Sequence, residues 1–170
     1  MRNGTMLFAD EVVTFSMSRA IGVELEEHEI ENFLKEQGLG VLGFAKGNEA
    51  YTIPIAFAYD GGGNRCFFRF IMDENSLKRV FVSETEIASL TVYEWKTKNQ
   101  WKSVIIKGPI QPVADSDLAE AATLFSDIGK EAALEVFNAP ISEYETMWYE
   151  LKISEIEGRG QFVGNRQSLV

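Results

Sequence analysis

The stretch of sequence that decides the fold runs from Gly38 to Val113. Its apolar segments read, in order, Gly38-Leu-Gly-Val-Leu-Gly-Phe-Ala45, Ala50-Tyr-Thr-Ile-Pro-Ile-Ala-Phe-Ala-Tyr59, Cys66-Phe-Phe-Arg-Phe70 and Trp101-Lys-Ser-Val-Ile-Ile-Lys-Gly108. Glycine-rich and polar residues separate these segments, as expected between strands. A short helical segment follows the third strand, and residues 87–93 add another strand before the last segment. The order of three strands, one helix and two strands predicts a small closed β-sheet.

Residues 50–59 form the clearest predicted strand. Successive side chains of a strand point to opposite faces, so the bulky residues share one face and the small residues share the other. The bulky set is Tyr51, Ile53, Ile55, Phe57 and Tyr59, and the small set is Ala50, Thr52, Pro54, Ala56 and Ala58. Small side chains let a ligand or another element approach the backbone closely, and Pro54 marks an edge strand or a bulge because it has no N–H to donate.

The flanking segments add helices and a final strand. Apolar periodicity predicts helices at residues 26–37, 76–82, 115–128 and 130–137, and a last strand at residues 147–156. Gly38 and Gly40 suit the end of the first helix, Asp73 or Asn75 suits the start of the second, and Gly108-Pro109 is expected to bend the strand over residues 101–113. The polar tail 158–170 is expected to be loose. Residues 1–22 show no period, which leaves open an extension, an arm over a partner or partial disorder.

Composition indicates one soluble domain spanning residues 1–170. The chain is 45% hydrophobic with a formal net charge of −10, and it contains no run of about 18 apolar residues that would span a membrane. The negative charge argues against affinity for nucleic acid or anionic membranes. Residues 1–19 do not resemble a secretory signal, and Cys66, the only cysteine, excludes a disulfide within the chain. We therefore expect a cytoplasmic protein.

A cationic corner is expected where the third strand meets the following helix. Arg69 lies near the end of that strand, Ser76 lies at the start of the helix, and Lys78 lies within it. Two cations, a hydroxyl and the backbone N–H groups of a helix start together suit a phosphate. The alternative is that Arg69 and Lys78 face solvent separately, as most charged residues do.

Two further segments suit a flat heterocycle. Backbone amides along Tyr51-Thr52-Ile53 can form hydrogen bonds to one, Trp101 can flank a ring, and Ser103 can bind a heteroatom. The alternatives are a plain core strand and a tryptophan that packs at the rim of a sheet.

Several kinds of catalytic site are missing from the sequence. His28 is the only histidine, so a multi-histidine metal site and a Ser-His triad are not expected within one chain. No glycine-rich nucleotide-binding motif follows a strand, and no carboxylate pair is placed for acid–base catalysis. We assign neither a catalytic residue nor a metal ligand.

Taken together, the order and spacing of these segments resemble the pyridoxamine 5'-phosphate oxidase-like FMN-binding split-barrel family. The resemblance covers residues 26–113, and the strand at residues 147–156 extends it. It implies a mainly β (α+β) fold: a six-stranded split barrel with flanking helices, forming a homodimer with FMN at the subunit interface. The strand at 50–59 has apolar residues on both faces, which also favours a partner that covers the apolar surface left outside the barrel.

The resemblance also implies roles for individual residues. Tyr51, Thr52 and Ile53 fall where the family's second strand runs along the isoalloxazine ring. Arg69 and Phe70 fall where the third strand reaches the ribityl phosphate, and Lys78 matches the basic residue that pairs with that phosphate. Ser103 matches a polar position that faces the ring.

The chain also departs from the family pattern. It has Leu77-Lys78 where the oxidases have an Arg-Lys pair, and it lacks a counterpart of their pyridoxal-phosphate-contacting residues. The function predicted from the sequence is an FMN-dependent oxidoreductase of unassigned substrate. The alternatives are a relative that binds the deazaflavin F420 and a non-catalytic flavin-binding or sensing module.

Overall fold

The structure is a computed structural model that describes residues 4–8, 11–15, 22–127 and 145–162. Its strands are β1 (Gly4–Phe8), β2 (Glu11–Phe15), β3 (Val23–Glu24), β4 (Leu39–Lys46), β5 (Glu49–Ala56), β6 (Ala58–Asp60), β7 (Arg65–Met72), β8 (Ala88–Thr97), β9 (Gln100–Gly108), β10 (Ile110–Pro112), β11 (Glu145–Lys152) and β12 (Glu155–Gln161). Its helices are α1 (Glu27–Gln37), α2 (Leu77–Glu84), α3 (Leu118–Asp127) and a short 3-10 helix, η2 (Asp115–Asp117). The mainly β architecture is confirmed.

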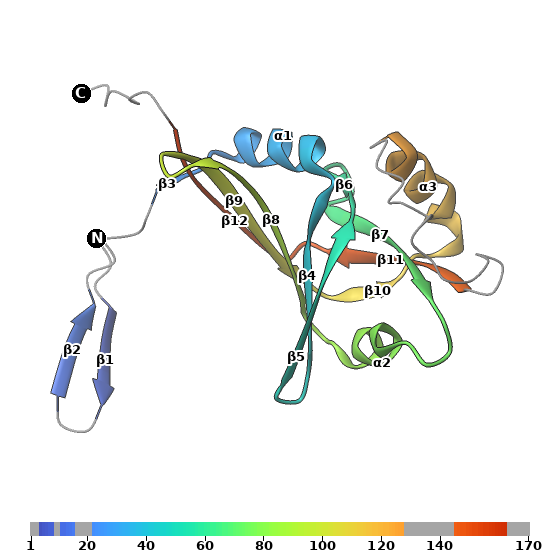
Figure 1. Cartoon of the computed structure of the whole chain (residues 1–170), viewed down its shortest axis with the longest axis horizontal. Helices are drawn as coiled ribbons and strands as arrows, with labels where there is room; N and C mark the ends of the chain where they lie inside the picture. The colour runs from blue at the N-terminus through green and yellow to red at the C-terminus, as the bar shows by residue number, and fades with distance from the viewer. Residues whose placement is uncertain (1–3, 9–10, 16–21, 128–144, 163–170) are drawn as a thin grey trace.

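The strands form two antiparallel sheets and a separate hairpin (Figure 1). The six-stranded sheet has the order β3-β12-β9-β8-β4-β5, and the four-stranded sheet has the order β10-β11-β7-β6. Among the described strands, β1 and β2 pair with each other and with no other strand. All six predicted strands are present, but two of them divide between the two sheets, the last is a pair of strands, and β1, β2 and β3 were not predicted.

The first division lies within residues 50–59, which we predicted to form one strand. Strand β5 ends at Ala56 in the six-stranded sheet, and β6 begins at Ala58 in the four-stranded sheet. Phe57 between them is fully buried, and its N–H donates to the carbonyl oxygen of Gly38 at 3.0 Å. Strand β5 is the edge strand of its sheet, as Pro54 predicted.

The second division lies at Pro109, where the predicted bend is confirmed. Strand β9 belongs to the six-stranded sheet and β10 to the four-stranded sheet. A Cβ atom on Gly108 would lie 1.7 Å from the carbonyl oxygen of Lys152, so only glycine fits at this crossing of β9 over the end of β11.

The C-terminal prediction needs a correction. Residues 158–161, which we expected in a loose tail, form the second half of β12 between β9 and β3. A Cβ on Gly158 would lie 2.8 Å from Cγ1 of Ile30, so the glycine lets α1 approach this strand. The helix predicted at 130–137 lies outside the described residues.

The first two predicted helices are present, and their ends follow from local sequence. Helix α1 begins after Glu26, which forms a capping box with Glu29, and it ends at Gly38 in the left-handed conformation at φ 60°. Helix α2 begins after Ser76, whereas Asp73 accepts a hydrogen bond from the N–H of Asn75 at 2.9 Å in the preceding turn.

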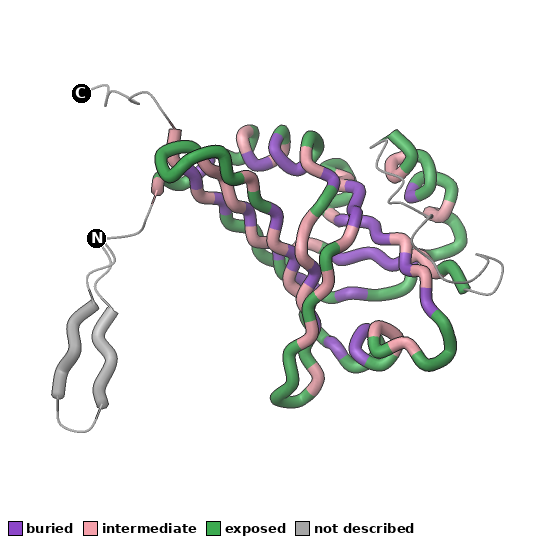
Figure 2. Tube along the Cα trace, viewed as in Figure 1, coloured by how far each residue is buried: buried purple, intermediate pink, exposed green. Residues whose placement is uncertain are grey.

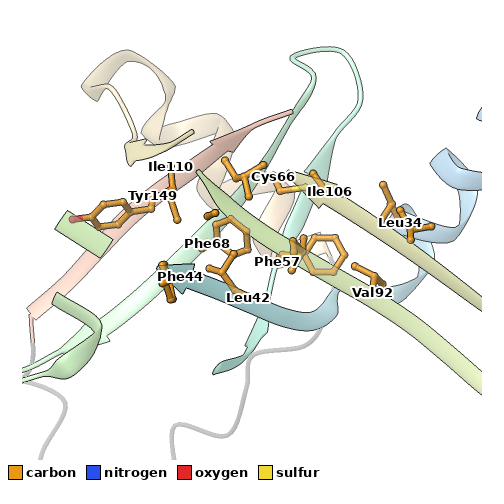
Figure 3. Packing of buried hydrophobic residues seen from close by; sticks show 14 of the residues in the cluster. Leu34, Leu42, Phe44, Phe57, Cys66, Phe68, Val92, Ile106, Ile110 and Tyr149 are labelled. Carbon is orange, nitrogen blue, oxygen red and sulfur yellow. The ribbon is translucent and has the colours of Figure 1, made fainter. Parts of the chain in front are cut away.

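The core lies between the two sheets. Buried positions alternate with more exposed ones along β4, β8 and β9 (Figure 2). The inward side chains pack against those of β7 and β11, and Figure 3 shows Leu42, Phe44, Phe57, Phe68, Val92, Ile106 and Tyr149 among them. The alternate side chains of the six-stranded sheet point away from this core, and we call that surface the outer face.

Candidate functional site

Lys78, one of the two cations of the cationic corner, contacts the backbone of the strand that carries the other, Arg69. The ammonium Nζ of Lys78 on α2 donates to the carbonyl oxygen of Ile71 at 3.2 Å. Ile71 lies two residues beyond Arg69 on β7, a step of about 7 Å along a strand. Burial lowers the pKa of Lys78, and the carboxylate of Asp73 partly opposes that shift.

Arg69 is available to a ligand. Its side chain is half-buried on the face of β7 opposite Phe70, beside its cross-strand neighbour Trp148. Within the part of the chain that the structure describes, Arg69 has neither an ion pair nor a hydrogen bond from its side chain. A half-buried guanidinium with no partner among the described residues suits an anion.

Ser76 adds a polar group and a helix start. It is the N-cap residue of α2, but its hydroxyl makes no capping hydrogen bond, and the first turn of α2 has no acidic residue. The N–H groups at this helix start therefore face no negative side chain from the helix itself, which favours an anion there when Lys78 also contributes.

The three residues predicted on the second strand point in two directions. Tyr51 and Ile53 pack inward against the core, and the Tyr51 ring stacks on Phe81 of α2 at a centroid distance of 5.0 Å. Thr52 is exposed on the outer face, opposite Gly43 of β4. The stack joins β5 to the helix that carries Lys78, so Tyr51 positions the corner instead of presenting its own ring to a ligand.

Phe70 does not offer its side chain to a cofactor. The residue is 1% exposed, and its ring packs against Phe44, Phe68 and Tyr149. Only its backbone could take part in binding.

Trp101 and Ser103 lie apart from the cationic corner. Both are on the outer face, where their direct cross-strand neighbours are Trp95 and Tyr93 on β8. Strands β8 and β4 separate β9 from β5, which is three strand spacings or about 14 Å. Within one chain, these two residues do not join Arg69, Ser76 and Lys78 in a single site.

Two cavities have walls made entirely of described residues. One of about 230 Å³ is lined by Phe33, Glu36, Glu94, Lys96, Gln100, Trp101, Lys102, Gln161 and Phe162. The other, of about 200 Å³, lies between β9 and β12 and is lined by Ile105, Lys107, Glu155, Ile156 and Glu157. Neither cavity includes a residue of the cationic corner.

Comparison with known families now assigns the chain. The profile of the pyridoxamine 5'-phosphate oxidase family matches residues 26–160, which is most of the sequence. The chain belongs to the pyridoxamine 5'-phosphate oxidase-like family. The match includes α1, the four-stranded sheet, the six-stranded sheet apart from β3 and the end of β12, and the cationic corner, and it confirms the resemblance found in the sequence.

Solved structures share the fold of this pyridoxamine 5'-phosphate oxidase-like protein. An FAD-binding protein of Mesorhizobium loti aligns with a TM-score of 0.68 and 19% identity, covering 84% of this chain and all of that chain. An FAD-binding protein of Mycobacterium smegmatis has a TM-score of 0.59 and 23% identity, covering 82% and 100%. An FAD- and haem-binding protein of the same organism has a TM-score of 0.60 and 12% identity, covering 81% and 72%. A search of curated proteins gives no match.

Sequence reasoning missed an ionic cluster in this family member. The guanidinium of Arg65, with a side chain only 14% exposed, binds four carboxylates from four elements. These are Asp60 at 2.9 Å, Asp117 at 2.6 Å, Glu120 at 2.9 Å and Glu150 at 3.0 Å. The hydrogen bond from Arg65 lowers the pKa of Asp117. Strand alternation places Arg65 on the same face of β7 as Arg69, but it gives no sign of the four carboxylates.

The Arg65 cluster fastens α3 over the four-stranded sheet. Apolar contacts around Phe67 and Ala121 continue the attachment, and the Phe125 ring meets the Trp148 ring edge-on at 5.4 Å. Trp148 is also the cross-strand neighbour of Arg69. The cluster therefore holds the sheet face on which Arg69 lies.

The described residues offer few other chemical groups. They contain no group of three or more histidine, cysteine or acidic side chains that could hold a metal ion, and none of their helices is long and apolar enough to cross a membrane. Burial raises the pKa of the Cys66 thiol, which suits a packed core residue and not a nucleophile.

Proposed function

We propose that this protein binds a flavin through its phosphate at the cationic corner and acts as a flavin-dependent oxidoreductase. The observation that carries the proposal is the approach of Lys78 to the strand that bears Arg69, which has no ionic or hydrogen-bonding side-chain partner among the described residues. The FAD-binding proteins that share the fold give it support.

The residues fit the phosphate of such a cofactor. Arg69 and Lys78 supply positive charge, the Ser76 hydroxyl supplies a donor, and the start of α2 supplies backbone N–H groups. A bound flavin would supply hydride-transfer chemistry, and the chain would supply binding, orientation and exclusion of water. FMN, FAD and F420 all carry phosphate, so this corner suits each of them.

We further propose that two copies of the chain assemble through the outer face. Large apolar side chains are exposed there, including Tyr93 at 61% and Trp95 at 65%. A cluster of this kind marks a surface that another protein covers. In such an assembly, a ring that reaches from the first copy's cationic corner round the edge strand β5 would meet Trp101 and Ser103 of the second copy, which would explain why these residues lie apart from the corner within one chain.

The visible spectrum of the purified protein tests the proposal first. We expect flavin absorbance, either in the protein as purified or after addition of FMN or FAD, and titration with F420 separates the deazaflavin alternative. Reduction of the bound flavin by a nicotinamide donor, followed by reoxidation, would support an oxidoreductase over a non-catalytic binding module.

A charge reversal then tests the site. Lys78→Glu should abolish binding of FMN, and Lys35→Glu on α1 is the matched control because Lys35 lies in an exposed pair with Glu31. Unchanged FMN affinity in Lys78→Glu would refute the site assignment. A colourless protein that ignores all three cofactors would refute the function.

A further inference from the structure

A third cation lies at the same end of the sheet as the cationic corner. Arg79 follows Lys78 on α2 and forms an ion pair with Glu145 at the start of β11. Glu145 is the cross-strand neighbour of Met72, the residue after Ile71, whose carbonyl oxygen accepts the ammonium of Lys78. Two consecutive side chains of α2 therefore reach the same end of the β7–β11 ladder.

The guanidinium of Arg79 has more N–H donors than it has acceptors among the described residues. A guanidinium carries five N–H groups, and the described residues give that of Arg79 a single acceptor group, the carboxylate of Glu145. Its Nε is buried without a hydrogen-bond partner among them. A buried donor without an acceptor is rare and costly, so this guanidinium gains from a group with more oxygens.

The pair that holds Arg79 is easily exchanged. Both side chains are partly exposed, at 37% for Arg79 and 58% for Glu145, and an exposed ion pair contributes little free energy. A phosphate has more charge and more acceptor oxygens than a carboxylate. A phosphate held by Lys78 would therefore compete well for the neighbouring guanidinium.

We infer that Arg79 is a further phosphate ligand, and that Glu145 is a counter-ion that the cofactor phosphate displaces. The inference rests on the proposed function. Arg79 would then supply the second cation of the family's Arg-Lys pair, whose first position is Leu77 in this chain. It also makes Glu145 a residue that sets affinity, because the free protein keeps Arg79 occupied until a phosphate arrives.

The experiment measures dissociation constants for FMN and for riboflavin, which lacks the phosphate, by quenching of flavin fluorescence. The variants are Arg79→Gln, Glu145→Gln and the double variant, with Glu31→Gln as the control. Glu31 also lies in an exposed ion pair, with Lys35 on α1, so its substitution removes the same charge elsewhere on the surface. Thermal melts of all variants confirm that they fold.

We expect Arg79→Gln to weaken FMN binding about tenfold or more, as the loss of a charge-assisted hydrogen bond implies. Glu145→Gln should strengthen FMN binding by up to about fivefold, which is the range for an exposed ion pair. Riboflavin binding should change in neither variant. In the Arg79→Gln background, adding Glu145→Gln should have no further effect, because Glu145 acts through Arg79.

Three results would overturn the inference while leaving the proposed function intact. They are unchanged FMN affinity in Glu145→Gln, an equal gain in Glu31→Gln, and a gain in Glu145→Gln that persists without Arg79. The last two would show a general effect of surface charge. If the unaltered protein binds no flavin at all, the proposed function fails and the inference fails with it.

Discussion

Replacement of Arg65 by methionine should destabilise the fold strongly. Methionine keeps much of the apolar stem but removes the guanidinium from among four carboxylates. Two of these are well buried, with Glu150 at 4% exposure and Asp60 at 11%. Removing one partner of a buried ion pair costs about 3–5 kcal/mol, because the charge left behind has no compensation.

The lower end of that range applies here. Glu150 keeps a hydrogen bond from Gln111 at 2.8 Å and a contact with Lys152 at 3.5 Å, so it is not left isolated. We therefore expect a loss of about 3 kcal/mol, which for a chain of this size lowers the melting temperature by about 6–12 °C. Urea titration and thermal melts at pH 7 measure the loss, and Lys35→Met on α1 is a control in an exposed pair.

The pH dependence gives a second readout for this variant. Arg65 lowers the pKa of Asp117 in the folded protein, so this interaction stabilises the fold fully above the ordinary range of a carboxyl group. The stabilisation is lost as pH falls through the lowered pKa. The difference between the parent and Arg65→Met should therefore narrow below about pH 4. A loss under about 1 kcal/mol at pH 7, or a difference that widens in acid, would refute the reasoning.

Three further predictions follow from single contacts. Gly108→Ala should leave the protein insoluble or several kcal/mol less stable in urea titrations, because its Cβ would lie 1.7 Å from a backbone oxygen. Gly47→Ala is the control: its Cβ would meet open space, and its φ of 57° should cost about 1 kcal/mol of stability. As pH rises, FMN affinity should fall at a lower pH than an ordinary lysine predicts, because burial lowers the pKa of Lys78. Lys78→Arg should keep its FMN affinity over the same pH range, because arginine stays charged. Identical pH profiles of FMN affinity in the two proteins would contradict a role for the ammonium. Trp95→Glu on the outer face should shift size-exclusion chromatography toward the monomer, and a parent protein that already elutes as a monomer would contradict the proposed assembly.

Local sequence predicted the elements well because their causes are local. The left-handed end of α1 at Gly38 and the edge position of Pro54 each follow from the backbone freedom of one residue. The alternation of burial predicted for residues 50–59 holds from Ala50 to Ile55 and then ends, because Ala56, Phe57 and Ala58 are all buried where the strand divides. It could not reveal that β5 and β6 join different sheets, because a period of two reports which face a side chain takes and not which strand lies beside it.

Distant contacts explain what the sequence did not reveal. Gly158 looked like part of a loose tail, yet it is glycine because Ile30 of α1 packs against its backbone. Arg65 lies 52 to 85 residues from three of its four carboxylates, so no pattern along the chain identifies the cluster. The cationic corner was easier to find, because Arg69, Ser76 and Lys78 lie on consecutive elements.

The opposite directions of the predicted site residues limit how a cofactor can bind. Arg69 lies on the face of the four-stranded sheet that α3 covers, whereas Trp101 and Ser103 lie on the outer face of the six-stranded sheet, and the packed core separates these surfaces. One flat molecule cannot touch both surfaces of the same copy. Either a second copy supplies the ring contacts or Trp101 and Ser103 have no part in binding. Mixing Lys78→Glu with Ser103→Trp decides between them. If two copies share a site, each variant alone should bind no FMN, and mixed dimers should recover about half of a site per chain. If Ser103 has no part in binding, Ser103→Trp alone should bind FMN fully, and mixing should add nothing.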